Sequence, residues 1–206
     1  MITSKGNTAP PSIATVAFKF FLGHAACGLI GLALLFSQTL HAETETEKIN
    51  KIKAAFVLNI AKFITWPSRV YEQRPDRLML CFYRHNPMGK ALTSIDGKRV
   101  KERRLHKKTV SSLSEGSTCD ILMVSSFELE NLRKELRQHY DTPVLIVADL
   151  TDRKTHGVAY DGVQLSLVRK GKGIGFEVNL ERVNRAGLKI SSELLKLATI
   201  VSEPDQ

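Results

Sequence analysis

Three short apolar runs that lack polar alternation constrain the fold of this chain more than any other feature. They are residues 78–83 (LMLCFY), 120–124 (DILMV) and 143–149 (PVLIVAD). Strands buried on both faces have this pattern, which is typical of a parallel sheet covered by helices. The sequence therefore predicts an α/β fold with a mostly parallel central sheet and helices on both of its faces.

A helix is predicted between the second and third runs, in residues 125–140 (SSFELENLRKELRQHY). Ser125 followed three residues later by Glu128 has the pattern of a capping box, and Pro143 marks the end of the segment. The apolar stripe of this helix consists of Leu129, Leu132, Leu136 and Tyr140. Together with the flanking runs, the helix predicts a right-handed β–α–β unit.

A second, more apolar helix is predicted for residues 49–65 (INKIKAAFVLNIAKFIT). Its apolar residues recur at steps of three and four and cover more than one stripe, and Trp66-Pro67 ends it. A helix of this composition either lies in the core or contacts another chain.

The C-terminal third predicts an antiparallel hairpin, because apolar residues alternate in residues 162–168 and 174–180 around the turn RKGKG. Two helical pieces follow, with Gly187 as a C-cap and Ser191 or Ser192 as an N-cap. Residues 97–110 are basic and predict a strand or an irregular hairpin. The whole is expected to be a single-domain sandwich.

Residues 1–42 have the order of a secretory signal peptide, with basic residues, the apolar run 20–36 and a small residue before the cut. We place the cut after Ala42, with residues 43–206 as the mature periplasmic domain. Two alternatives stay open, a retained membrane anchor and a lipoprotein signal at Cys27. The apolar run is short for a membrane span.

The mature chain is basic. Residues 1–42 contain two lysines and no acidic residue, so removing them changes the formal charge from +9 to +7. In an exported protein this charge favours lipid phosphate, cell-wall polymers or an acidic protein surface as partners over nucleic acid.

The mature chain also keeps an even pair of cysteines, Cys81 and Cys119. Exported compartments are oxidising, so a disulfide is expected, and closing a loop of this length is worth about 4 kcal/mol. Two buried free thiols are the alternative.

No pattern for catalysis or metal binding stands out. The histidines of the mature chain, none of them at metal-ligand spacing, are His85, His106, His139 and His156. Neither a nucleophile elbow nor a phosphate loop is present, since GKGIG lies in the predicted hairpin. We therefore expect a binding or regulatory protein without a metal or cofactor, and not an enzyme.

Two features carry open alternatives. Asp149 ends a buried strand, where α/β folds place functional acids, and it can equally cap the next turn. The basic run VKERRLHKKT is either a solvated face or a patch that meets phosphates or an acidic partner.

Several blocks resemble the YfiR family of periplasmic regulators. They are KAAFVLNIAKFITWP, LCFY, CDILMVSSFE, PVLIVAD and GFEVNLERVNRAGLKISSELLKLA, and they cover residues 51–198. The first and last blocks are the specific ones. This resemblance implies a periplasmic, dimeric α/β sandwich that binds and inhibits the periplasmic sensor domain of an inner-membrane diguanylate cyclase. It also places Cys81 and Cys119 where a family disulfide is expected.

Glu177 and Asn179 share the polar face of a strand within the most family-specific block. We expect Glu177, Asn179, Arg182 and Val183 to form part of the surface that docks the partner. Asn179 can instead simply cap the next helix, and Glu177 can pair with a neighbouring cation. A periplasmic small-ligand-binding domain that reports to a sensor kinase or another receptor is the alternative function, and it predicts a pocket near Asp149.

Overall fold

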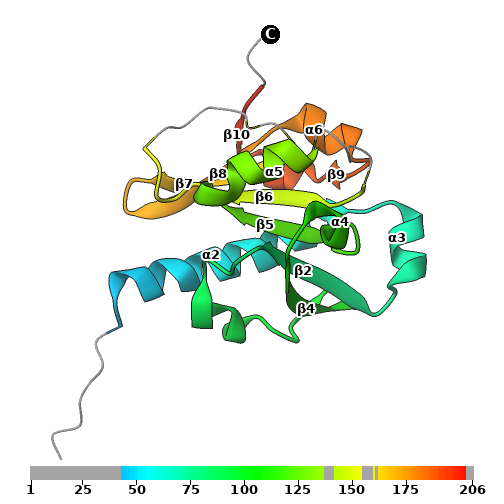
Figure 1. Ribbon diagram of the computed structural model, residues 1–206, viewed down its shortest axis with the longest axis horizontal. Coiled ribbons are helices and arrows are strands. Elements are labelled where there is room, and N and C mark those ends of the chain that lie inside the picture. The colour runs from blue at the N-terminus through cyan, green and yellow to red at the C-terminus, as the bar shows by residue number, and fades with distance from the viewer. Residues whose placement is uncertain (1–42, 137–141, 155–159, 161, 203–206) are drawn as a thin grey trace, which may run out of the picture. The chain divides into compact units, whose positions relative to one another are not determined.

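A computed structural model describes residues 43–136, 142–154, 160 and 162–202. Its main feature is an eight-stranded sheet in the order β10-β8-β7-β6-β5-β2-β4-β3 (Figure 1). The strands are β2 (Arg77–Tyr83), β3 (Arg99–Val100), β4 (Arg103–Val110), β5 (Ile121–Ser125), β6 (Leu145–Asp149), β7 (Leu165–Lys170), β8 (Gly173–Val178) and β10 (Thr199–Ile200). A separate antiparallel pair joins β1 (Ile64–Thr65) to β9 (Lys189–Ile190).

The centre of the sheet is parallel, as the apolar runs predict. Strands β4, β2, β5, β6 and β7 lie side by side and run in one direction. The chain passes from β2 to β4 on one side and then returns to β5 on the other side of β2. This reversal between β2 and β5 is a topological switch point, the place where open α/β sheets commonly bind ligands at the carboxyl ends of their strands.

Helices cover both faces of the sheet, and a separate hydrophobic core lies on each face. The first core contains buried residues of α2 (Glu45–Lys62), η1 (Gly89–Ser94), α6 (Leu180–Arg185) and α7 (Ser192–Leu195). The second contains residues of α4 (Leu113–Gly116) and α5 (Leu129–Leu136), which follows the short η2 (Ser126–Glu128). The short α3 (Ser68–Gln73) lies between β1 and β2. The α/β fold with helices on both faces is thus confirmed.

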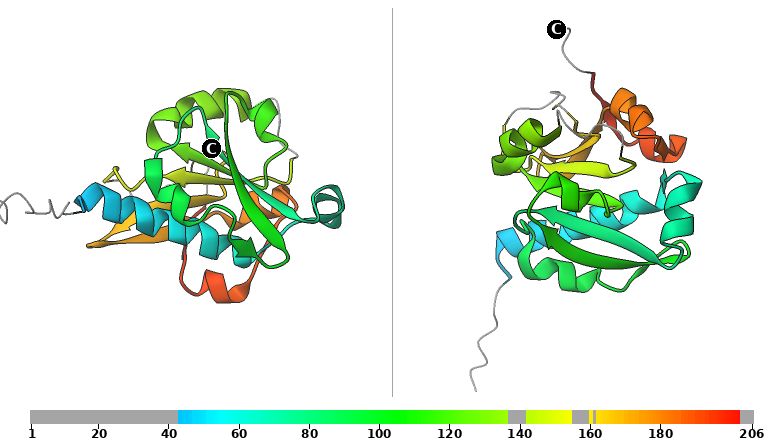
Figure 2. Two further views of the ribbon diagram at one scale, coloured as in Figure 1. Left: turned by 90° about the horizontal axis from the view of Figure 1, so that it is seen from below. Right: turned by 45° about the vertical axis from the view of Figure 1, so that its right-hand side comes forward.

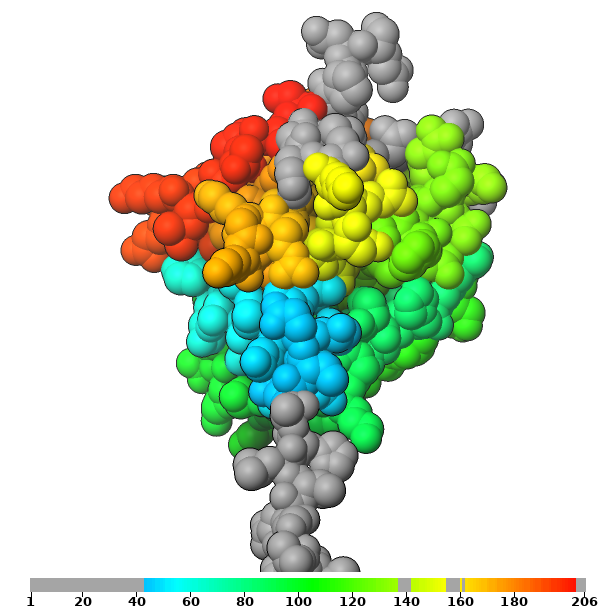
Figure 3. All heavy atoms as spheres, turned by 90° about the vertical axis from the view of Figure 1, so that its left-hand side faces the viewer, coloured from blue at the N-terminus to red at the C-terminus, as the bar shows by residue number. Residues whose placement is uncertain are grey.

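Helix α2 begins earlier than the sequence predicts because a capping box precedes it. Thr44 Oγ1 accepts a hydrogen bond from Glu47 N, and Glu47 Oε2 accepts one from Thr44 N. The helix ends at Lys62, since Ile64 and Thr65 are extended in β1. It buries one side against the sheet and therefore belongs to the core. Its first turns lie at the surface beside the β7–β8 hairpin (Figure 3).

The predicted C-terminal hairpin is present, and the basic segment forms a hairpin, one of the two alternatives predicted for it. Strands β7 and β8 pair antiparallel down to Lys170 and Gly173, and Gly171 takes a positive φ of 58° in the two-residue turn. In the basic segment β3 pairs antiparallel with β4. Lys101 lies in the turn between them with a φ of 54°.

The helix signals of the C-terminal segment are also confirmed. After α6, Gly187 has a φ of 69°, and Leu188 N donates to Val183 O as in a Schellman motif. Ser191 caps α7 through a hydrogen bond from Leu194 N.

The predicted capping box at Ser125 is wrong. The Ser125 hydroxyl is buried and has no hydrogen-bond partner in the described part of the chain. Glu128 instead accepts from Asn131 Nδ2 and lies 3.5 Å from Arg84 Nη1. The segment therefore opens as the short 3-10 turn η2 before α5, and Tyr140 lies outside the described residues.

Candidate functional site

The four residues predicted to dock a partner lie together at the junction of β8 and α6, but they are buried. Their exposed fractions are 4% for Glu177, 2% for Asn179, 6% for Arg182 and 1% for Val183. Strand β8 is covered on both edges, with Glu177 paired in register to Ser166 of β7 and Thr199 of β10. These side chains therefore do not themselves present an exposed docking surface.

Asn179 caps helix α6, which was the alternative to its predicted docking role. Its Oδ1 accepts a hydrogen bond from Arg182 N at 3.0 Å, which satisfies a free N–H of the first turn of α6. Glu177 and Arg182 each take part in a polar or charged interaction. The junction is thus a buried polar cluster that fixes where α6 begins.

The exposed side of α6 consists of Glu181, Asn184 and Arg185. Glu181 and Arg185 form an ion pair one turn apart. Because α6 is anchored through buried Asn179 and Val183, these three residues form the outward surface of the segment in which a docking role was predicted.

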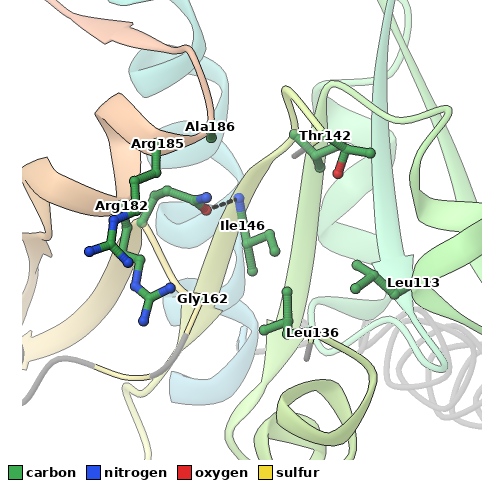
Figure 4. A pocket seen from close by; sticks show the side chains of 10 residues that line it. Leu113, Leu136, Thr142, Ile146, Gly162, Arg182, Arg185 and Ala186 are labelled. Atoms are coloured by element: carbon green, nitrogen blue, oxygen red, sulfur yellow. Dashed lines mark hydrogen bonds between the residues drawn. The ribbon is translucent and has the colours of Figure 1, made fainter. Parts of the chain in front are cut away.

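A small cavity adjoins the same helix (Figure 4). Arg182 and Arg185 of α6 and Ala186 just after it lie on one side of the cavity, and Leu113 and Leu136 lie on the other. Its volume of about 20 Å³ leaves room for roughly one water molecule. A hydrogen bond from Ile146 N to Gln164 Oε1 crosses its lining. The cavity is too small for an organic ligand.

A larger hollow of about 180 Å³ lies at the carboxyl end of β5. It is lined by Ser126, Phe127, Leu129, Glu130, Arg133, Arg153 and Tyr160. Phe127 is 79% exposed, and Arg153 Nη2 donates to Ser126 O. The hollow combines aromatic and guanidinium groups beside the topological switch point.

Asp149 lies at the end of β6, where its carboxylate is fully engaged. Oδ2 accepts from Lys53 Nζ at 2.7 Å in a buried ion pair, and Oδ1 accepts from Thr151 N and Thr151 Oγ1. Asp149 thus caps the following turn, and it also ties α2 to the sheet. Lys53 is a residue that sequence reasoning missed, since nothing local distinguishes it from the other lysines of α2.

A polar cluster also lies at the carboxyl end of β2. The buried Tyr83 donates its hydroxyl proton to Glu135 Oε1 at 2.6 Å, and Glu135 Oε2 accepts from Leu113 N. Burial, and then the hydrogen bond to Glu135, raise the pKa of Tyr83 to about 12. Arg84 follows with a φ of 63° and lies 3.7 Å from Glu135. The cluster joins β2, α4 and α5.

The predicted disulfide is present between Cys81 of β2 and Cys119 just before β5, with Cα atoms 6.0 Å apart. Both cysteines are fully buried in the core that α4 and α5 cover. The bond therefore links two adjacent parallel strands from inside the protein.

Metal ligands do not gather anywhere in the part of the chain that the structure describes. His85 and His106 are exposed, and His139 and His156 lie outside the described residues. Within those same limits, no helix has the length and apolar character needed to cross a membrane. The predicted signal peptide, residues 1–42, also lies outside the described residues.

A comparison with protein families decides the relationship that these features suggest. A family model described as YfiR/HmsC-like matches residues 50–199. The chain belongs to the YfiR/HmsC-like family. The match begins within α2 and ends at the first residue of β10, and it includes Cys81 and Cys119. The YfiR/HmsC-like family is one of non-catalytic periplasmic regulators of diguanylate cyclase signalling.

A solved structure also aligns with this YfiR/HmsC-like chain, the ABC domain in complex with L-Trp from Streptococcus pneumonia. The TM-score is 0.43 at 11% sequence identity, with 70% of this chain covered. The chain spans 59% of the length of that structure. A likeness at this level carries no argument about fold or ligand.

Proposed function

We propose that this protein binds the periplasmic sensor domain of an inner-membrane diguanylate cyclase and inhibits the enzyme, which lowers cellular cyclic di-GMP. The observation that carries the proposal is the YfiR/HmsC-like match over residues 50–199. The buried disulfide and the basic mature chain suit an exported protein that acts by contact. In this proposal residues 1–42 are the cleaved export signal, and the mature protein is a homodimer.

The contact with the sensor domain is proposed to involve the outward side of α6. Glu181, Asn184 and Arg185 supply exposed polar groups there. The buried cluster of Glu177, Asn179, Arg182 and Val183 acts indirectly, because it holds the start of α6 in place. In this proposal the four residues position α6 in place of contacting the partner themselves.

Cellular cyclic di-GMP after deletion and restoration of the gene tests the function directly. Deletion is expected to raise the nucleotide level, and restoring the gene is expected to return it to the starting level. An unchanged level on deletion would remove a diguanylate cyclase as the target.

Two charge reversals test the docking side. Glu181→Lys is expected to weaken capture of the purified sensor domain at least tenfold, because it breaks the pair with Arg185 and inverts the exposed charge. Glu72→Lys makes the same charge change on exposed α3 and is the matched control. If both variants bind the sensor domain as the wild type does, the outward side of α6 is not the contact. Inhibition of the cyclase through another surface is then tested by the cyclic di-GMP level after gene deletion.

Glu177→Lys has a different expected result. A lysine at a position with 4% exposure leaves a buried charge in an environment built for a carboxylate, so the domain should lose stability. Its thermal unfolding midpoint should fall well below that of Glu181→Lys. An unchanged midpoint would contradict the buried position of Glu177.

The hollow at the carboxyl end of β5 favours a second candidate function, a small-ligand-binding domain that reports to another receptor. Arg133 of its lining is ion-paired with Glu130. The Arg153 guanidinium beside Phe127 and Tyr160 suits an aromatic or apolar carboxylate. A thermal-shift screen of aromatic carboxylates on the wild type and on Arg153→Gln tests it. Stabilisation of the wild type alone would support this candidate, and a flat screen would remove it.

A further inference from the structure

Three arginines lie in a row across the outer strands of the sheet. Arg77 of β2 is paired in register with Arg104 of β4, and Arg104 is paired with Arg99 of β3. Residues directly opposite each other on neighbouring strands project from the same face, and neighbouring strands are about 4.8 Å apart. The sheet therefore carries three adjacent guanidinium side chains on one face.

Two further basic groups extend the row along β4. His106 and Lys108 follow Arg104 at steps of two residues and so share its face. Lys108 Nζ donates to Thr118 Oγ1, on the side of the sheet where α4 lies. We call this set of five residues the basic face: Arg77, Arg99, Arg104, His106 and Lys108. In the right-hand view of Figure 2, the ribbons of β2 and β4 are turned toward the viewer without a helix in front of most of their length.

The alternate residues of β4 have a different role. Arg103 and Leu105 are buried, and Arg103 pairs with Asp120 inside the protein. Residues 97–110 contain seven lysines and arginines and one acidic residue, Glu102. The strand thus uses Arg103 for the core and Arg104 for the surface.

The row of arginines is poorly compensated within the protein. Like charges directly opposite each other on neighbouring strands destabilise a sheet. Arg77 lies 3.6 Å from Asp76 and Arg99 lies 3.8 Å from Glu102, and the side chains of these pairs are 59–93% exposed. Exposed ion pairs contribute little. Arg104 has no carboxylate within ion-pair distance among the described residues, and its Nη1 donates a long hydrogen bond to Gly97 O at 3.5 Å.

We propose that the basic face docks on the anionic phospholipid headgroups of a membrane surface. Guanidinium groups match phosphate oxygens in bidentate hydrogen bonds, and a row of them on adjacent strands can contact several neighbouring headgroup phosphates at once. The proposal goes beyond inhibition of a cyclase, because it concerns where the protein resides.

An acidic protein surface is the weaker fit for the basic face. The cores of protein interfaces are apolar and depleted of lysine, with large side chains that fill pockets. Within the described ranges, the exposed large apolar residues are Ile52, Phe127, Leu197 and Ile200. Each lies on α2, on η2 or in the segment after α7, and none belongs to β2, β3 or β4. The basic face offers charge without an apolar anchor, which is the pattern of headgroup binding.

Vesicle flotation tests the proposal. The protein is produced from its full gene, purified as the cell processes it, and its mass measured to establish whether residues 1–42 are present. It is then mixed with vesicles of pure phosphatidylcholine or of phosphatidylcholine with phosphatidylglycerol. Binding is expected only to the anionic vesicles and is expected to disappear in high salt.

Two triple variants locate the binding. Arg77→Gln, Arg99→Gln and Arg104→Gln together are expected to weaken binding to anionic vesicles on the order of 100-fold, at about fivefold for each cation. Lys170→Gln, Lys172→Gln and Lys196→Gln together remove the same charge from exposed positions elsewhere and should change binding much less. Arg104→Lys keeps the positive charge and should retain most of the binding to anionic vesicles. This variant checks that weaker binding reflects the lost charge and not a disturbed fold.

Three results would overturn the proposal. The first is no binding to anionic vesicles at low salt, even if the basic face proves to bind an acidic protein. The second is equal loss in the two triple variants, which would show that only net charge matters. The third is full binding by the arginine variant with its melting temperature unchanged.

Discussion

Asp120 Oδ1 accepts a hydrogen bond from Arg103 Nη1 at 2.9 Å, and both side chains are almost completely buried. The Arg103 guanidinium lies 4.9 Å from the ring centre of Trp66 and 4.7 Å from that of Tyr71. Arg74 Nη2 approaches the same carboxylate oxygen at 3.4 Å. One buried carboxylate thus joins α3, β4 and β5 near the amino ends of the parallel strands.

Removal of this carboxylate should destabilise the domain strongly. Asp120→Asn leaves Arg103 buried without a counter-charge and weakens the short hydrogen bond from Met79 N. The expected loss in the free energy of unfolding is about 3–5 kcal/mol, measured by chemical denaturation. Asp76→Asn, an exposed neighbour, is the control and should change the free energy by less than about 0.5 kcal/mol. Similar losses in free energy of unfolding in both variants would contradict the claim that the buried Arg103–Asp120 pair stabilises the domain more than an exposed carboxylate does.

The Lys53–Asp149 pair gives a second prediction, on coupling between α2 and β6. Lys53→Met leaves a buried carboxylate without its cation, so the free energy of unfolding should fall by about 3 kcal/mol or more. Asp149→Asn should lower the free energy of unfolding less in the Lys53→Met variant than in the wild type, because the carboxylate that it removes is already unpaired in that variant. A double-mutant cycle in urea measures this difference. Additive losses would mean that the two side chains do not interact.

The disulfide should stabilise the fold by restricting the unfolded chain. Joint replacement of Cys81→Ala and Cys119→Ala is expected to lower the free energy of unfolding by about 4 kcal/mol, for a sequence separation of 38 residues. Unfolding in the presence of reductant should give a lower free energy of unfolding for the wild type. The value for the double variant should not change. A wild type that is equally stable in reductant would contradict the expected stabilisation by the bond.

Tyr83 should make stability depend on alkaline pH. Its pKa is raised from 10.0 to about 12, so the folded state favours the neutral phenol. This contribution is fully present below pH 10 and is lost as pH rises through about 12, by about 3 kcal/mol in all. Tyr83→Phe lacks the titration, so the gap in unfolding free energy between wild type and variant should narrow from pH 9 to pH 12. A constant gap would contradict the shifted pKa.

The sequence predicts the sheet well because its signals are local. The apolar runs reflect burial on both faces, and they correspond to β2, β5 and β6 in the expected parallel arrangement. The alternating segments give the β7–β8 hairpin, and Gly187 and Ser191 act at the helix ends where they were placed. Each of these features depends on residues within a few positions of one another.

The candidate site was harder to predict, since it depends on contacts between distant segments. The alternation at Glu177 and Asn179 correctly indicates polar residues on β8, but it does not reveal that these residues are buried. The edge strand β10, which pairs with β8 beside Glu177, is two exposed residues long and has no pattern of its own. The same limit applies to Ser125, because the sequence does not reveal that Arg84 competes for Glu128.

The position of α2 has a consequence for how the protein reaches this state. The first described helix completes its packing against elements near the other end of the chain: Lys53 meets Asp149, 96 residues later, and Phe56 contacts Phe176. Any chain made from its N-terminus therefore emerges with its most apolar helix long before the strands that cover it. Contacts this distant in sequence slow folding and leave apolar surface exposed in the meantime. Until β8 is released, α2 therefore lacks the contacts with Asp149 and Phe176 that complete its packing.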